Sequence, residues 1–297
     1  MAEARGQTLL QRHTLSACEL AEVEQLASAC NTHDNLLMRL DYNMLALKSL
    51  PTDDIFLYYA GSKLAGCLLL DRYHSDVKEV TGMVYPALRR RGLFTRLLLA
   101  ARDECLNRGV RHLLFPCETT SASGRAFLHA IRAGREFAEH RMVLRDFRSR
   151  FQHDNRLLFR EALRADLEAL AVILMADFGN SAEQARQYVS RSFERPNQCI
   201  YLATYEETNA ERADPVGTLR VEEMPSEQGI YGFFVRPKYR GRGYGRQILE
   251  ETIIAVRQHS QKPIMLEVDI NNFTALNLYR SLGFVIERTY EYYGLTL

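Results

Sequence analysis

Apolar and polar residues follow two periods along this chain, one typical of strands and one typical of helices. Short runs rich in β-branched and aromatic residues, bounded by turn-forming residues, predict strands, and apolar residues spaced three and four apart predict amphipathic helices. The first half is predicted to contain strands at 55–59, 64–71, 77–84 and 113–117. It is also predicted to contain helices at 17–30, 36–47 and 124–133, and a further helix that ends at 106. The second half is predicted to contain strands from 157 and at 200–205, 216–223, 229–235 and 263–270, and helices at 166–178, 182–193, 247–260 and 272–283.

The two halves therefore repeat one order of elements. A polar stretch, Arg-Ser-Arg-Phe-Gln-His-Asp-Asn-Arg, separates them and has the composition of a linker. The repeat predicts two domains of ordinary size, residues 1–150 and 155–297.

A loop rich in glycine and arginine joins the predicted strand at 229–235 to the helix at 247–260. It reads Arg-Pro-Lys-Tyr-Arg-Gly-Arg-Gly-Tyr-Gly-Arg and ends at Arg246. Its three glycines let the backbone approach a ligand, and the helix that follows offers free N–H groups and the positive end of its dipole. We expect a phosphate or pyrophosphate here, with a plain turn carrying solvated arginines as the alternative. The spacing fits neither a P-loop nor a dinucleotide fingerprint.

A second motif follows the predicted strand at 263–270. Asn272 is suited to cap the next helix and Gly283 to end it. The motif reads Asn-x-x-Ala-x-x-Leu-Tyr-x-x-Leu-Gly-Phe and is matched at Asn272, Ala275, Leu278, Tyr279, Leu282, Gly283 and Phe284. Together with the Arg-x-x-Gly-x-Gly pattern that begins at Arg240, it resembles the two signatures of the GCN5-related N-acetyltransferase (GNAT) superfamily.

This resemblance implies a fold and an activity. The fold is α/β (α+β mixed sheet): two tandem domains, each a mostly antiparallel sheet flanked by helices and splayed to admit acetyl-CoA. The activity is transfer of an acetyl group to a primary amine by direct attack, in the C-terminal domain. The resemblance also implies that the backbone of Phe234 and Val235 pairs with pantetheine. It places the pyrophosphate on Arg240, Gly241, Arg242, Gly243, Tyr244, Gly245 and Arg246, with Asn272 and Tyr279 as further contacts of acetyl-CoA.

Two residues are candidates for catalysis. The phenol of Tyr279, with an ordinary pKa of about 10, can protonate a departing thiolate if it is held within hydrogen-bond reach. Its alternative is a packed aromatic residue on an amphipathic helix. Glu267 resembles the base of some protein N-terminal acetyltransferases of the family. Asp269 shares its strand face by alternation, and Glu222 or Glu223 could act through water.

The N-terminal half departs from the pattern. Phe94 stands where the second loop has Gly245, and a large side chain there hinders the approach of a pyrophosphate. When the glycines that end the two motif helices are aligned, Ala130 takes the place of Tyr279. We therefore expect a degenerate half that shapes structure or substrate access.

The charge, the apolar runs and the cysteines of the chain argue against several classes of protein. The 297 residues carry 38 basic and 37 acidic side chains, so no electrostatic argument favours nucleic acid or a membrane as partner. The sequence has no apolar run long enough to span a bilayer and no recognisable signal peptide. The six cysteines have no C-x-x-C spacing, which predicts reduced thiols and no metal site. We expect a cytoplasmic enzyme acting on a small-molecule or peptide amine, its oligomeric state left open. The competing hypothesis is a non-catalytic acyl-CoA sensor or scaffold.

Overall fold

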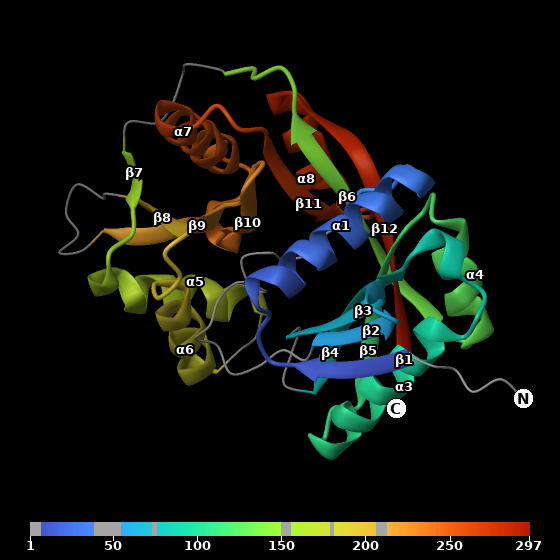
Figure 1. The fold of residues 1–297 in the computed structure, drawn as a ribbon. Helices are drawn as coiled ribbons and strands as arrows, with labels where there is room; N and C mark the ends of the chain where they lie inside the picture. Colours follow the sequence, from blue (N-terminus) through green and yellow to red (C-terminus); the bar gives the residue numbers. More distant parts are fainter. Residues whose placement is uncertain (1–6, 39–54, 73–75, 150–155, 179–180, 206–212) are drawn as a thin grey trace, which may run out of the picture. The chain divides into compact units, whose positions relative to one another are not determined.

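The computed structural model describes residues 7–38, 55–72, 76–149, 156–178, 181–205 and 213–297, which form two compact units (Figure 1). Unit 1 is Met1–Glu139 with Arg288–Leu297, and unit 2 is His140–Glu287. The proposed boundary between the sequence repeats, 150–155, lies outside the described residues.

Unit 1 contains a sheet in the order β1-β2-β3-β4-β5-β12. Its pairs are antiparallel except β4 with β5, which are parallel. The elements are β1 (Gln7–Arg12), α1 (Ala17–Asp34), β2 (Ile55–Ala60), β3 (Lys63–Arg72), β4 (Val77–Val84), α3 (Leu93–Asn107), β5 (His112–Glu118), α4 (Ala122–Ala130) and β6 (Gly134–Leu144), with a 3-10 turn, η1, at Pro86–Leu88.

Unit 2 repeats this plan, in the sheet order β7-β8-β9-β10-β11-β6. Only β10 and β11 are shown to be parallel within it. Its elements are β7 (Leu157–Glu161), α5 (Leu167–Phe178), α6 (Ala182–Ser192), β8 (Gln198–Tyr205), β9 (Asp214–Glu223), β10 (Gln228–Val235), α7 (Tyr244–His259), β11 (Ile264–Asp269), α8 (Phe273–Leu282) and β12 (Phe284–Thr296), with 3-10 turns η2 at Arg164–Asp166 and η3 at Pro237–Tyr239.

The predicted fold class is confirmed, and most predicted elements appear within a few residues of their expected bounds. The helix predicted at 36–47 falls largely on 39–54, outside the described residues, while residues 36–38 are not helical. Strands β1, β6 and β12 were not predicted. Their sequences mix charged and apolar residues without clean alternation, because each lies partly exposed.

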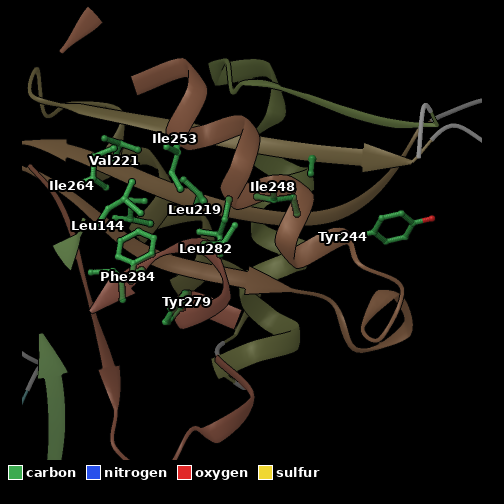
Figure 2. Packing of buried hydrophobic residues seen from close by; sticks show 14 of the residues in the cluster. Leu144, Leu219, Val221, Tyr244, Ile248, Ile253, Ile264, Tyr279, Leu282 and Phe284 are labelled. Carbon is green, nitrogen blue, oxygen red and sulfur yellow. The ribbon is translucent and has the colours of Figure 1, made fainter. Parts of the chain in front are cut away.

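Apolar side chains cover both faces of the sheet in unit 2. Figure 1 shows α7 on one face of β8, β9 and β10, with α5 and α6 on the other. On the α7 face, Ile248 and Ile253 pack with Leu219 and Val221 (Figure 2). On the opposite face, Leu170 and Val189 are among the residues that bury Ile200, Leu202 and Phe234. Because each fully buried aliphatic side chain stabilises the fold by about 1.5–3 kcal/mol, these two layers hold the central strands rigidly.

The last strand of the chain belongs to both units. Phe284, at its start, is buried in the core of unit 2, whereas Tyr290 to Thr296 pair with β5 of unit 1. Strand β6 likewise begins in unit 1 and ends, from His140, in unit 2. Unit 1 is therefore completed by the C-terminal residues of the chain.

Candidate active site

Strands β10 and β11 are paired along only part of their length. The parallel register covers Gln228–Ile230 with Ile264–Leu266, although β10 runs on to Val235 and β11 to Asp269. Tyr231 and Glu267 are therefore the first residues past the paired segment. The same short parallel pairing occurs between β4 and β5 in unit 1. The splayed sheet that the family resemblance predicted is thus visible in the strand register.

A bulge in β10 changes which backbone groups face the unpaired edge. Its register with β9 shifts between Tyr231 and Phe234, and Gly232 there has a φ of 58°. The Phe234 carbonyl points to β9, so close to Gly217 that a Cβ there would lie 2.5 Å from the oxygen. Because backbone groups alternate along a strand, Val235 is the residue turned toward the unpaired edge. Of the two residues expected to pair with pantetheine, Val235 has the suitable direction.

The glycine loop has the backbone that the sequence predicted. Gly241 and Gly243 have φ values of 74° and 83°, in the left-handed region that disfavours other residues. Gly243 is the N-cap of α7 and supplies no side-chain hydrogen bond. In contrast, a serine or asparagine side chain caps α1, α4, α6 and α8. Among the described residues, no side chain caps the start of α7, and this is the arrangement that suits an anion.

Asp214 holds the segment that leads into this loop. Its carboxylate accepts hydrogen bonds from Arg236 (2.6 Å), from Tyr239 (2.6 Å) and from Lys238. Burial raises the pKa of Asp214, but the hydrogen bonds from Lys238, Tyr239 and Arg236 outweigh it and lower the pKa to about 2. The two cations before the loop are thus paired within the protein.

The loop arginines differ in their contacts. Arg240 donates from Nε to the Val235 carbonyl at 2.8 Å. Arg246 pairs with the buried Glu250 at 2.7 Å and also donates to the Ser281 carbonyl, which ties α7 to α8. Arg242 lies with its guanidinium 5.8 Å from the Tyr239 ring and forms no ion pair with the described residues. Of the three, Arg242 keeps its charge available for a ligand.

Two further loop residues take structural positions. The Tyr244 ring is buried and lies 5.9 Å from Tyr205 and 6.0 Å from Tyr239, so only its backbone can face a ligand. Gly245 brings α7 against β10 and α8, since a Cβ there would lie 3.5 Å from both Phe233 and Leu278.

Helix α8 positions Tyr279. Asn272 caps this helix by accepting from Ala275 N at 3.1 Å, and Gly283 ends it with a φ of 101°, as predicted. Tyr279 is 6% exposed and packs near Phe284 (Figure 2), and its ring centroid lies 6.5 Å from that of Phe233. Its hydroxyl forms no hydrogen bond with the described residues, and burial raises its pKa to about 12. The phenol therefore stays protonated at neutral pH and has a proton to donate.

Three of the four candidate bases, Glu267, Asp269 and Glu222, lie on the face of the sheet opposite α7. Leu266 and Val268 join the core beneath α7, so the alternating residues Glu267 and Asp269 face the side of α5 and α6. Glu222 shares that side and accepts from Gln198 Nε2 at 2.8 Å. Glu223 forms an ion pair with Lys262 at 2.8 Å.

Tyr279 and Glu267 thus approach the separation of β10 and β11 from opposite faces. A ligand lying between the two strands would have Tyr279 on one face and Glu267 on the other. Among the described residues, no group of three His, Cys, Asp or Glu side chains could hold a metal ion. No described helix is both long and apolar enough to cross a bilayer.

Unit 1 has a similar loop but a different interior. Gly92 and Arg90 have φ values of 75° and 64°, which match Gly243 and Gly241. However, the Phe94 ring lies against β4, where a Cβ on Gly82 would be 2.9 Å from the ring. The centroid of the Phe94 ring is also 4.8 Å from that of Phe127 on α4. Strand β4 also pairs with β3 without a register shift. The ring occupies the seam between β4 and α4.

The helix register in unit 1 corrects the alignment made from the sequence. Ser121 caps α4 as Asn272 caps α8. Counting from these caps places Leu128, not Ala130, at the position of Tyr279, and both residues are buried. Aligning the terminal glycines was wrong because α4 ends early and is followed by a turn, with Arg132 at a φ of 59°. No phenol stands at this position in unit 1.

Sequence reasoning missed three contributors to the site. Asp214 could not be found, because its partners lie more than twenty residues away and no local pattern links them. Gly232 did carry a signal, since an isolated glycine within a strand often marks a bulge. Gly217, which faces the Phe234 carbonyl, is the third, and only the pairing of β9 with β10 reveals it.

Comparisons with known proteins agree with this geometry. The model of the acetyltransferase (GNAT) family matches residues 20–131 and 167–284. N-alpha-acetyltransferase 30 of Saccharomyces cerevisiae is 37% identical over 85 residues, which are 27% of this chain and 48% of the yeast protein. N-alpha-acetyltransferase RimI of Mycobacterium tuberculosis is 42% identical over 60 residues, 20% of this chain and 36% of that protein. The chain thus spans less than half the length of these curated relatives.

A solved structure extends the likeness to the whole chain. A tandem GNAT protein from the clavulanic acid biosynthesis pathway superposes with a TM-score of 0.78, and the alignment covers 98% of both chains. Its sequence identity is 16%, so this likeness shows the fold alone.

Proposed function

The chain belongs to the acetyltransferase (GNAT) family, and on this premise we propose that unit 2 transfers an acetyl group from acetyl-CoA to a primary amine. The observation that carries this proposal is the Tyr279 hydroxyl, which is largely buried, protonated and without a hydrogen-bond partner among the described residues. The likeness to N-alpha-acetyltransferases supports an amine as acceptor.

The donor is bound by the backbone of β10 and of the loop. Pantetheine amides pair with Val235 at the edge that β11 leaves open, while the pyrophosphate lies on the N–H groups at the start of α7. Arg242 adds charge-assisted hydrogen bonds, and Arg240 and Arg246 hold the loop in shape.

The reaction then needs three proton transfers, two from the nitrogen and one to the sulfur. A lysine-like amine has a pKa of about 10.4, so freeing its lone pair at pH 7 costs roughly 4–5 kcal/mol. In our proposal Glu267 takes that proton, directly or through water. The amine attacks the thioester carbonyl, its nitrogen gives up a second proton to water, the C–S bond breaks, and Tyr279 donates to the departing sulfur. Because the Tyr279 pKa is about 12, the proton moves as the sulfur gains charge, and solvent then restores the phenol.

The test is release of free CoA thiol over a panel of amines, comparing the wild-type protein with Tyr279→Phe. We expect kcat to fall by about 10²- to 10⁴-fold, as for a lost general acid, with little change in acetyl-CoA affinity. The loss should shrink at low pH, where solvent protonates the sulfur more easily. Tyr205→Phe is the matched control, since Tyr205 is a buried tyrosine of the same core.

Two outcomes would contradict this proposal. A Tyr279→Phe variant with wild-type kcat from pH 6 to 9 would remove the acid role and leave a packing residue. Tight acetyl-CoA binding without turnover on any amine would instead indicate an acyl-CoA sensor.

A further inference from the structure

Arg220 lies on β9 on the face covered by α5 and α6. It pairs in register with Ile200 on β8 and with Tyr231 on β10, so the three side chains share that face. Its Nη1 donates to the hydroxyl of Tyr188 on α6 at 2.7 Å. The guanidinium therefore lies between α6 and the sheet, on the side where Glu267 also faces.

The guanidinium has no counter-ion among the described residues. Its carbon lies 5.5 Å from the centroid of the Tyr231 ring, and Tyr188 offers only a neutral oxygen. The Nε atom is buried and has no acceptor. The acid two positions along the strand, Glu222, is hydrogen-bonded instead by Gln198 and Asn197. A buried donor left unsatisfied costs about 1–3 kcal/mol, which an anion binding here would recover.

Three other buried or partly buried arginines of unit 2 are paired with carboxylates, and a fourth, Arg257, donates to the carbonyls of Ser260 and Lys262. Arg236 contacts Asp214, Arg246 contacts Glu250, and Arg141 contacts both Glu227 and Glu287. Arg220 shares an unsatisfied Nε with Arg141 but differs from all of them in being surrounded by aromatic side chains, with no carboxylate or carbonyl partner among the described residues. These surroundings indicate that the Arg220 guanidinium binds a ligand.

The position of Arg220 relative to the unpaired ends of β10 and β11 indicates which ligand its guanidinium meets. Tyr231, the register partner of Arg220, is level with the point where β10 and β11 stop pairing. Paired strands lie about 4.8 Å apart, so the backbone of Arg220 is roughly 10 Å from that of Glu267 where the pairing ends, and the guanidinium carbon lies 5.5 Å from the ring of Tyr231 on the strand between them. The phosphate loop follows the other end of β10, after Val235. Arg220 therefore faces the acceptor and not the pyrophosphate.

We propose that Arg220 binds a carboxylate of the acceptor, so that the substrate is a primary amine with a carboxylate a few bonds away. The proposal rests on the acetyltransferase function of unit 2. A guanidinium presents paired donors that match a carboxylate, and the free Nε and Nη2 of Arg220 form such a pair. A peptide whose second residue is glutamate has this chemistry, as does a short ω-amino acid.

The test uses two matched pairs of acceptors. Ala-Glu-Ala-NH₂ and Ala-Gln-Ala-NH₂ share the same amine and nearly the same size, and so do 4-aminobutanoate and 4-aminobutanamide. We expect kcat/KM for the acidic member of at least one pair to be about 10- to 100-fold higher, the range of a charge-assisted bidentate contact. Arg220→Gln should remove the difference chiefly through KM, without changing acetyl-CoA affinity. Arg220→Glu should favour Ala-Lys-Ala-NH₂.

Arg186→Gln is the matched control, because Arg186 lies on the same helix as Tyr188 and forms an exposed pair with Glu168. It should keep the preference for the acidic acceptor. Equal kcat/KM within both pairs for the wild-type protein would overturn the proposal. So would an Arg220→Gln variant that lowers kcat/KM equally for both members, since that indicates a structural role.

Failure of the acetyltransferase function is distinguishable from failure of this proposal. If no amine is acetylated, calorimetry of the same four acceptors against the CoA-loaded protein still measures the preference. Tighter binding of an acidic member, lost in Arg220→Gln, supports the carboxylate site. Equal affinities within both pairs would overturn it.

Discussion

At the scale of single residues, Asp214 shows how one carboxylate prepares a binding loop. It accepts from three side chains of the segment 236–239, which leads into the glycine loop. The loop therefore approaches its ligand with its neighbouring cations already neutralised, and its glycine backbone supplies the binding groups. Arg240 and Arg246 follow the same principle, because their strongest contacts are within the protein.

A first prediction at this scale concerns pH. The pKa of Asp214 is lowered from its ordinary value of 3.8 to about 2, so its ionised form stabilises the fold fully above pH 4. That contribution is lost as the pH falls from about 4 through 2. Asp214→Asn should lower the melting temperature by a few degrees at pH 7 and weaken acetyl-CoA binding. A hydrogen bond to a charged group contributes about 1.5–3 kcal/mol, and less when the group is partly exposed. The gap to the wild-type protein should close near pH 2.

The measurement is thermal unfolding from pH 7 to 2, with Asp146→Asn as control. Asp146 forms an exposed pair with Arg148, with side-chain exposures of 71% and 66%. Surface pairs of this kind contribute little. A melting-temperature gap between Asp214→Asn and wild type that stays constant down to pH 2 would show that the carboxylate is not the stabilising group.

At the scale of elements, the strand β10 and the helix α7 act together. The bulge at Gly232 turns Val235 to the open edge, and the left-handed Gly243 starts α7 without a side-chain cap. Strand β4 and helix α3 have the same order and a similar loop, but lack the bulge and carry Phe94 in the first helical turn. We therefore attribute the difference in acetyl-CoA binding expected of the two units to the bulge in β10 and to the ring of Phe94.

A prediction at this scale separates backbone strain from ligand contact. Gly243→Val and Gly61→Val both force a side chain onto a left-handed residue, with φ values of 83° and 66°, and neither Cβ would meet another atom within 4 Å. Both should lose a similar stability, about 1–2 kcal/mol. Only Gly243→Val should lose acetyl-CoA binding, because it redirects the first N–H groups of α7.

Calorimetry with acetyl-CoA, together with thermal unfolding of each variant, measures both effects. Unchanged affinity in a folded Gly243→Val protein would remove the phosphate-loop assignment. Loss of binding in the Gly61→Val variant as well would show that general destabilisation is responsible.

At the scale of the whole molecule, two units of one plan have different interiors. Each has a short parallel pairing that then ends, but in unit 1 Phe94 packs against Gly82 and Phe127, and Leu128 stands in place of a phenol. The chain also closes unit 1 with its last ten residues, Arg288–Leu297. Strand β12, through Thr296, must therefore be synthesised before unit 1 has its full sheet.

The prediction at this scale is the stoichiometry of the donor. Native mass spectrometry should show one tightly bound CoA per chain, and Gly243→Val should abolish it, because unit 1 has the Phe94 ring in its β4–α4 seam. Phe94→Gly tests whether that ring is the obstacle and should allow weak binding of a second CoA. Two equivalent CoA molecules on the wild-type chain would show that unit 1 also binds the donor.

Local sequence determined the parts of this protein that depend on near neighbours. The glycine loop, the caps at Asn272 and Gly283 and most strands and helices follow from side chains a few residues apart, so the pattern predicted them. Tertiary structure decided the rest: which arginines are paired, the clamp on Asp214, the register of Leu128 and the unsatisfied Arg220. Each of these depends on contacts between residues distant in sequence, and hydrophobic periodicity carries no information about such pairings.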